Sequence, residues 1–201
     1  MDLLIKNGTI VTAKEMFKAD IAVNGEKIQA IGHDFDESNF KTSIDADNKL
    51  ILPGAIDGHT HLALSFGGTT TSDDYFAGTR SAACGGTTTV FDFVNQAHGE
   101  KMLDAVKRRD ALASVDAAVD YSFHIGVSDV ESEGMLESME DAVEFGIPSF
   151  KVFMVYDYGV DDGSFFKVLC KSKEIGALVG VHAENRDVNN FLVQKYLSEG
   201  K

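Results

Sequence analysis

The chain has 201 residues and a formal charge of −14; 44 % of its residues are apolar and 25 % charged, as in ordinary globular proteins. The acidic balance argues against a nucleic-acid partner, which would need clustered Lys and Arg, and no apolar run is long enough to cross a membrane. The first residues lack the basic segment and cleavage site of a signal peptide, and two cysteines cannot build a disulfide framework. We therefore expect a cytoplasmic protein.

The first fifty residues predict short antiparallel strands. Apolar runs flank Asn7-Gly8 within residues 3–12 and Asn24-Gly25 within residues 20–32. Asn-Gly is the favoured two-residue turn of β-hairpins, so two hairpins are expected here. A further strand is expected at residues 42–46.

From residue 50 onwards, the pattern changes to an alternation of strands and helices. Strands are predicted at residues 50–57, 87–93, 118–127, 149–155 and 177–182, and helices at residues 71–83, 101–112, 133–145, 164–175 and 187–197. Strands that alternate with helices of this length are typical of βαβ units around a parallel sheet. The sequence therefore predicts an α/β fold with five parallel strands in residues 51–201.

The first strand of this region ends in Asp57-Gly58-His59-Thr60-His61. Residues two apart on a strand face the same way, so Asp57, His59 and His61 point to one side. Two imidazoles in this arrangement can bind one metal ion, although a polar loop that happens to contain two histidines would look the same. The position favours a site, because parallel α/β folds place ligands at the carboxyl ends of their strands.

Lys151 lies inside the apolar strand 149–155, where an unpaired lysine is unusual. One interpretation is an edge lysine whose ammonium group reaches water. The other is an amine with a lowered pKa that reacts with carbon dioxide to give a carbamate, which can bridge two metal ions. His182 ends the fifth strand, whereas His124 lies mid-strand and is expected to be a hydrogen-bonded core residue. Three strands that each end in a metal-competent side chain make a metal site the favoured hypothesis.

Several motifs occur together along the chain. They are Pro53-Gly54-Ala55-Ile56-Asp57-Gly58-His59-Thr60-His61, Phe66-Gly67-Gly68-Thr69, Asp73-Asp74-Tyr75-Phe76, Gly85-Gly86-Thr87-Thr88, Ser149-Phe150-Lys151-Val152-Phe153-Met154 and Val181-His182-Ala183-Glu184-Asn185. In content and order they resemble the hydantoinase/dihydropyrimidinase branch of the cyclic amidohydrolases, and the resemblance covers the whole chain.

The resemblance implies a (β/α)8 TIM-type barrel whose first five strands lie in residues 51–201, preceded in residues 1–50 by strands of a small β-sandwich. It also implies two divalent metal ions, most often zinc. By motif, His59 and His61 would bind the first ion, Lys151 would bridge both as N6-carboxylysine, and His182 would bind the second. Tyr156 would hydrogen-bond the oxyanion of the reaction. Asp57 is a candidate to orient the metal ligands without binding the metal itself.

The implied activity opens the ring of a 5-substituted hydantoin or a dihydropyrimidine to an N-carbamoyl amino acid. A homotetramer or dimer is expected by the same resemblance. A full barrel takes roughly 250 residues against about 150 after position 50, so we expect part of a longer enzyme, inactive alone. Two alternatives stay open: an allantoinase-type amidohydrolase, and a non-catalytic scaffold relative of the same fold.

Overall fold

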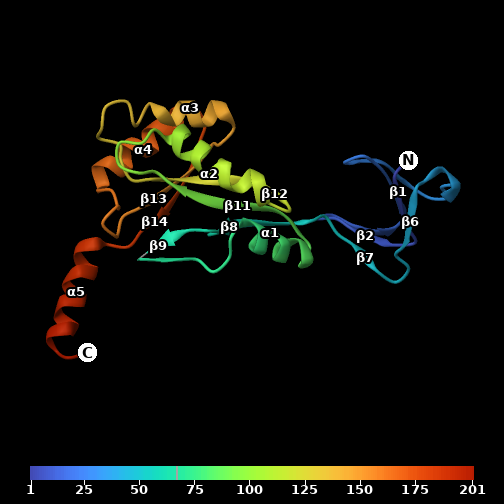
Figure 1. The fold of residues 1–201 in the computed structure, drawn as a ribbon, viewed down its shortest axis with the longest axis horizontal. Coiled ribbons are helices and arrows are strands. Elements are labelled where there is room, and N and C mark those ends of the chain that lie inside the picture. The colour runs from blue at the N-terminus through green and yellow to red at the C-terminus, as the bar shows by residue number, and fades with distance from the viewer. Residues whose placement is uncertain (67) are drawn as a thin grey trace. The chain divides into compact units, whose positions relative to one another are not determined.

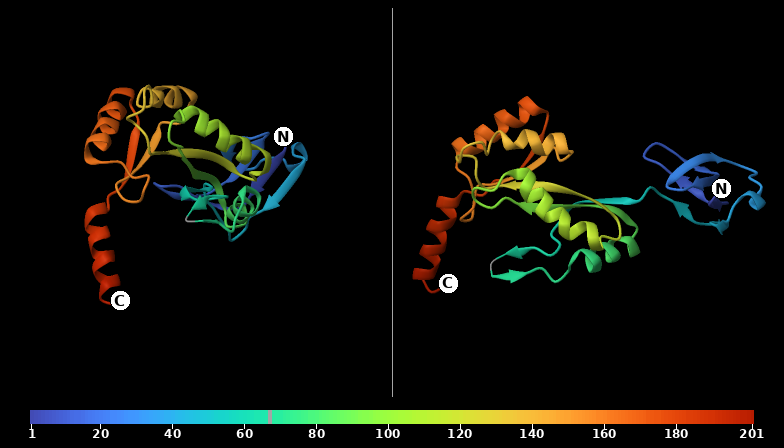
Figure 2. Two further views of the ribbon diagram at one scale, coloured as in Figure 1. Left: turned by 60° about the vertical axis from the view of Figure 1, so that its left-hand side comes forward. Right: turned by 45° about the horizontal axis from the view of Figure 1, so that its top comes forward.

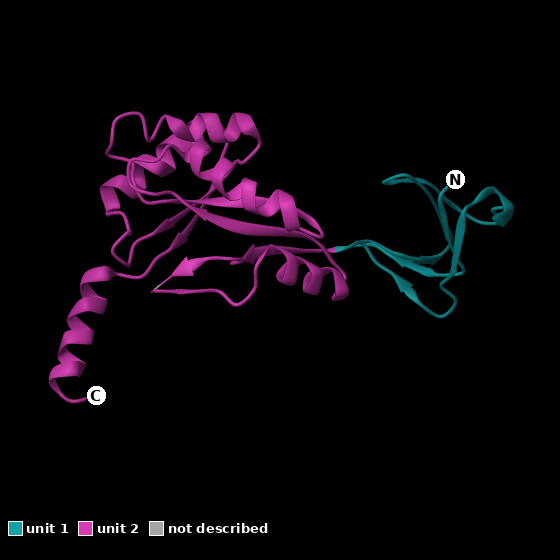
Figure 3. Ribbon diagram, viewed as in Figure 1, with its two compact units in different colours: residues 1–54 teal, residues 55–201 magenta. Residues whose placement is uncertain are grey.

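The computed structural model describes residues 1–66 and 68–201 (Figure 1). Gly67, within the motif Phe66-Gly67-Gly68-Thr69, lies outside the described residues. The chain forms two compact units, Met1–Gly54 and Ala55–Lys201 (Figure 3). Each unit has an apolar cluster of its own. Within the described ranges, no helix combines the length and the apolar character needed to cross a membrane.

The first unit consists of two small sheets. Its elements are β1 (Leu3–Lys6), β2 (Thr9–Val11), β3 (Met16–Lys18), β4 (Asp20–Asn24), β5 (Lys27–Gly32), the 3-10 helix η1 (Glu37–Asn39), β6 (Thr42–Asp45) and β7 (Leu50–Ile51). One sheet has the order β5-β4-β1-β6 and the other β3-β2-β7. Ile10 and Ile51 from one sheet pack with Ile5 and Ile21 from the other, so the two sheets share one apolar layer, as in a β-sandwich.

One of the two predicted hairpins is wrong. β1 and β2 flank Asn7-Gly8 but lie in different sheets, where they pair in parallel with β6 and β7. The backbone N–H of Asn7 donates to the side chain of Asp20 at 2.8 Å, and a side chain at Gly8 would overlap Ile51. These residues therefore form a corner at which the chain passes from one sheet to the other. The second hairpin, β4–β5, is confirmed, and because Asn24 pairs with Lys27 its two-residue turn is Gly25-Glu26.

The second unit contains the predicted parallel sheet. Its elements are β8 (Ala55–Thr60), β9 (Ser65–Phe66), β10 (Thr69–Thr70), α1 (Tyr75–Cys84), β11 (Thr87–Asn95), α2 (Met102–Asp116), β12 (Asp120–Val127), α3 (Ser138–Phe145), β13 (Ser149–Phe153), α4 (Asp162–Ile175), β14 (Leu178–His182) and α5 (Arg186–Ser198). The sheet order is β8-β11-β12-β13-β14, and every pair is parallel. This arrangement is a half-barrel of five strands, which confirms the predicted fold class.

Several predicted boundaries differ from the structure; helix α2, for example, ends at Asp116 rather than at residue 112. The apolar run at residues 50–57 is two strands, β7 and β8, because Pro53 lacks the N–H that a continuous strand would pair. Helix α1 begins at Tyr75 rather than at residue 71, since the side chain of Asp74 accepts the Ala77 N–H at 2.7 Å and caps the helix there. Helix α3 begins at Ser138 rather than at residue 133.

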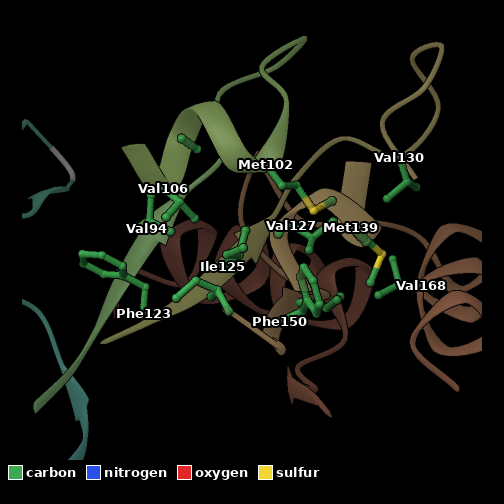
Figure 4. Close-up of a cluster of buried hydrophobic side chains, with 14 of the residues drawn as sticks. Val94, Met102, Val106, Phe123, Ile125, Val127, Val130, Met139, Phe150 and Val168 are labelled. Carbon is green, nitrogen blue, oxygen red and sulfur yellow. The ribbon is translucent and has the colours of Figure 1, made fainter. Parts of the chain in front are cut away.

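The core of this unit lies between the sheet and helices α2, α3 and α4, which cover one face (Figures 1 and 4). On β13, Phe150 and Val152 are almost fully buried in this core, while Lys151 between them is half-buried. Side chains alternate along a strand, so the buried pair turns Lys151 to the opposite face of the sheet. Helix α5 projects away from the helical layer and has no buried residue (Figure 2).

Candidate metal centre

The His59–His61 pair lies at the carboxyl end of β8. The Nε2 atoms of the two rings are 3.2 Å apart. Two imidazoles on one tetrahedral zinc ion, each at about 2.0–2.1 Å from the metal, would place these atoms about 3.3 Å apart. Phe93 of β11 packs against both rings, with centroid distances of 4.5 Å and 4.8 Å. The pair is therefore held in a geometry that fits a single metal ion.

Lys151 and His182 line the same pocket as the histidine pair. This pocket has a volume of about 340 Å³, within the range of small-molecule sites. Both side chains contact the ring of Phe153: the Lys151 Nζ is 5.4 Å from its centroid, and the His182 ring is stacked on it at 5.8 Å. His182 Nε2 lies 2.5 Å from a carboxylate oxygen of Glu184, a contact that must open if this nitrogen is to bind a metal.

The four side chains fit a metal centre only if Lys151 changes its chemistry. In the described part of the chain, no three His, Cys, Asp or Glu side chains converge as a ready-made metal site. An ammonium group cannot bind a cation, whereas a carbamate on the same nitrogen offers two anionic oxygens. The structure thus brings the predicted ligands into one pocket, where a carbamate on the lysine would add oxygen donors to the three imidazoles.

The protein surroundings lower the pKa of His61. Burial is the largest cause, and the positive charges of His59, Arg109 and Lys151 act in the same direction, while Asp92 opposes them. The neutral imidazole is favoured as a result, and it is the form that binds metals.

Tyr156 lines the pocket, whereas Asp57 is not among the residues that line it. Tyr156 follows β13, has a left-handed backbone with a φ of 69°, and places its ring 5.8 Å from the ring of His182. It lines the pocket together with the apolar side chains Leu64 and Phe66. Asp57 is exposed, and its carboxylate accepts the backbone N–H of His59 at 3.2 Å.

Two further polar residues lie on the pocket face of the sheet. Asn95, at the carboxyl end of β11, lines the pocket and was missed by the sequence reasoning, although its place at a strand end was a usable signal. His124 is hydrogen-bonded through both ring nitrogens, to the Ser149 hydroxyl at 2.6 Å and to the Gly58 carbonyl at 2.9 Å. It is therefore the satisfied histidine that was expected.

Comparison with known proteins places this geometry in a family. Residues 50–187 match the amidohydrolase family. The whole chain is 45 % identical to a D-hydantoinase of Geobacillus stearothermophilus, of which it covers 43 %. Over 92 % of its length, the chain is 39 % identical to a dihydropyrimidinase of Dictyostelium discoideum, of which it covers 37 %.

The similarity extends to solved structures. A D-hydantoinase structure superposes on the whole chain with a TM-score of 0.94 and 41 % identity, and 44 % of that protein is covered. The dihydropyrimidinase from Brevibacillus agri NCHU1002 superposes on 98 % of the chain with a TM-score of 0.93 and 46 % identity, and 43 % of it is covered. The chain spans less than half the length of these relatives. It belongs to the amidohydrolase family, and within that family to the group of D-hydantoinases and dihydropyrimidinases.

Proposed function

We propose that this chain supplies metal ligands to an enzyme that hydrolyses the cyclic amide bond of 5-substituted hydantoins or dihydropyrimidines to N-carbamoyl amino acids. The observation that carries the proposal is the convergence of His59, His61, Lys151 and His182 in one pocket. The similarity to D-hydantoinases over the full chain supports the substrate class. Because the chain spans less than half of its relatives, the activity is proposed for the protein that contains it.

In this proposal, the histidine pair would hold one divalent cation, His182 would hold a second, and the carboxylated Lys151 would bridge both. Nitrogen-rich ligand sets of this kind suit zinc. The Lys151 ammonium group first loses one proton. The resulting amine attacks carbon dioxide, a nitrogen–carbon bond forms, and a second proton leaves the nitrogen, so the side chain changes from a cation to an anion. When bound, the two cations act as Lewis acids and lower the pKa of bound water towards neutrality.

The remaining pocket residues act on the substrate. The Tyr156 phenol donates a hydrogen bond to the ring carbonyl oxygen as negative charge develops on it. Leu64, Phe66 and Tyr158 form an apolar wall, which suits an alkyl or aryl substituent on the ring and excludes water from it. Substrate orientation and oxyanion stabilisation therefore come from the same pocket wall.

The test is Lys151→Ala in the protein expressed from its complete gene. We expect this variant to lose bound metal and the hydrolysis of a 5-substituted hydantoin, and to recover part of both in the presence of short carboxylic acids, which replace the carbamate oxygens. Lys167→Ala is the matched control, since Lys167 is an exposed lysine paired with Glu131. Full metal content and normal turnover in Lys151→Ala would contradict the proposal.

The proposal also covers the cellular location, the binding partner and the oligomeric state of this enzyme. Cys84 and Cys170 are both unpaired and exposed, which favours a reducing cytoplasm. The charge of −14 speaks against nucleic acid as a partner, so a small cyclic ureide is the proposed one. A homotetramer or dimer is proposed from the family resemblance, and light scattering on the purified protein measures it directly.

A further inference from the structure

A buried ionic cluster lies on the helix-facing side of the sheet. It consists of Asp92 on β11, Arg109 on α2 and Tyr75 at the start of α1, with exposed fractions of 0 %, 6 % and 2 %. The proposed reaction uses none of these residues. Because side chains alternate on β11, Asp92 and the neighbouring Phe93, which packs on the histidine pair, point to opposite faces of the sheet.

Both oxygens of the Asp92 carboxylate accept hydrogen bonds. Oδ2 accepts the Tyr75 hydroxyl at 2.5 Å and two N–H groups of Arg109, at 2.7 Å and 3.1 Å. Oδ1 accepts the backbone N–H of Leu62 at 3.1 Å. Since a buried ion pair often stabilises a protein no better than apolar residues of the same size, overall stability is a weak reason for this cluster.

The cluster also forms hydrogen bonds with the backbone directly after His61. Arg109 donates to the Leu62 carbonyl and, at 3.2 Å, to the Ala63 carbonyl. Together with the Asp92 contact, three backbone groups of residues 62–63 are bound by one ion pair. Ala63 has a left-handed backbone with a φ of 44°, which alanine adopts only at a cost and under outside restraint.

We propose that Asp92 and Arg109 are positioning residues that fix the chain exit from β8, and thereby set the metal affinity of the His59–His61 pair. Without the two carbonyl contacts, the Leu62–Ala63 segment relaxes towards an ordinary backbone. The Nε2 atoms of His61 and His59 then no longer lie at the separation that fits one metal ion. This inference rests on the proposed metal site.

The experiment measures metal affinity rather than turnover alone. Zn²⁺ affinity is determined by chelator competition in the protein from its complete gene, and Co²⁺ substitution reports the ligand geometry through its visible spectrum. Arg109→Met removes the ion pair and both carbonyl contacts. Arg109→Lys keeps the positive charge but cannot reach Asp92 and two carbonyls together, so it tests the same contacts with less risk to folding.

We expect both Arg109 variants to bind Zn²⁺ about 10- to 100-fold more weakly, as supporting contacts behind metal ligands typically do, with an altered Co²⁺ spectrum. Val106→Ala is the control, because Val106 is a fully buried residue of the same helix. It should lower the melting temperature without changing the affinity.

Wild-type affinity and spectrum in Arg109→Lys, or an equal loss of affinity in Val106→Ala, would overturn the inference. If the wild-type protein itself binds no Zn²⁺, the proposed metal site is wrong, and the inference about Asp92 and Arg109 fails as well.

Discussion

The loop between β13 and α4 offers a sharp test of how the pocket is shaped. Its ends are joined by the Val160 N–H, which donates to the Phe153 carbonyl at 2.8 Å. Gly159 lies inside this loop, and its carbonyl accepts a hydrogen bond from Arg186 at 2.5 Å. A Cβ atom at Gly159 would lie 2.3 Å from the Val155 carbonyl oxygen and 2.9 Å from the Arg186 Nη2. A backbone oxygen cannot turn aside as a flexible side chain can, so Gly159→Ala must move the loop.

The size of the effect follows from that overlap. Restoring ordinary contact distances requires a displacement of about 1 Å in the segment that carries Tyr156. Overpacking of this kind costs about 1–3 kcal/mol of folding free energy. A misplacement of about 1 Å in a substrate-positioning group can reduce turnover by about 100-fold. We therefore predict that Gly159→Ala lowers kcat/KM for a 5-substituted hydantoin by about 100-fold, while the metal content is unchanged, because the ligands lie on strands or directly after them.

Steady-state formation of the N-carbamoyl product gives kcat/KM, and elemental analysis gives the metal content. Gly163→Ala is the matched control: Gly163 lies in the first turn of α4, where the nearest atom to an added Cβ is 3.4 Å away. Alanine there favours the helix by up to about 1 kcal/mol. Wild-type kcat/KM in Gly159→Ala, or an equal loss in Gly163→Ala, would refute the reasoning.

Three further predictions concern stability, each measured by urea unfolding. Burial opposes the charge of Asp129, but hydrogen bonds from Ser132 and backbone N–H groups outweigh it and lower the pKa to about 2 from 3.8. Above pH ~4 the ionised Asp129 thus contributes about 2 kcal/mol to the free energy of unfolding, and this contribution is lost as the pH falls towards 2. Asp129→Asn should therefore flatten the dependence of stability on pH in this range. An unchanged pH profile in this variant would contradict the prediction. Ile125→Ala should cost about 2–5 kcal/mol, since the side chain is fully buried, and a cost below 1 kcal/mol would show a core that collapses around the cavity. Asp161→Ala removes the cap that accepts the Ser164 N–H at 2.7 Å and should cost about 1 kcal/mol; no loss would mean that water replaces the cap.

The parallel sheet could be predicted because its signal is local. Each strand of the second unit is an apolar run bounded by turn residues, and each helix has its own periodicity. The corner at Asn7-Gly8 could not be predicted, because the same two residues serve a hairpin or a crossing between sheets, and distant partners such as Asp20 decide which. The start of α1 was misplaced for a similar reason, since Thr71 and Asp74 are both plausible caps.

The candidate site likewise contains residues that could be predicted from the sequence and residues that could not. The histidine pair, Lys151 and His182 could be found because polar residues at strand ends stand out against apolar runs. The Asp92–Arg109 pair was missed, although a lone carboxylate inside the apolar strand 87–93 is as unusual as Lys151 in its own strand. Its partner is one of several charged residues on α2, and only the packing of α2 on β11 selects it.

The corner at Asn7-Gly8 has a consequence for how the nascent chain folds. Because β1 pairs with β6 and β2 with β7, one sheet of the first unit cannot be completed until Asp45 has been synthesised, and the other not until Ile51 has been synthesised. In the second unit, each new strand pairs with the strand made just before it, so that sheet can grow as translation proceeds. Pairing between distant segments slows folding, and the first unit is therefore expected to complete its sheets in a late, collective step, although it is made first.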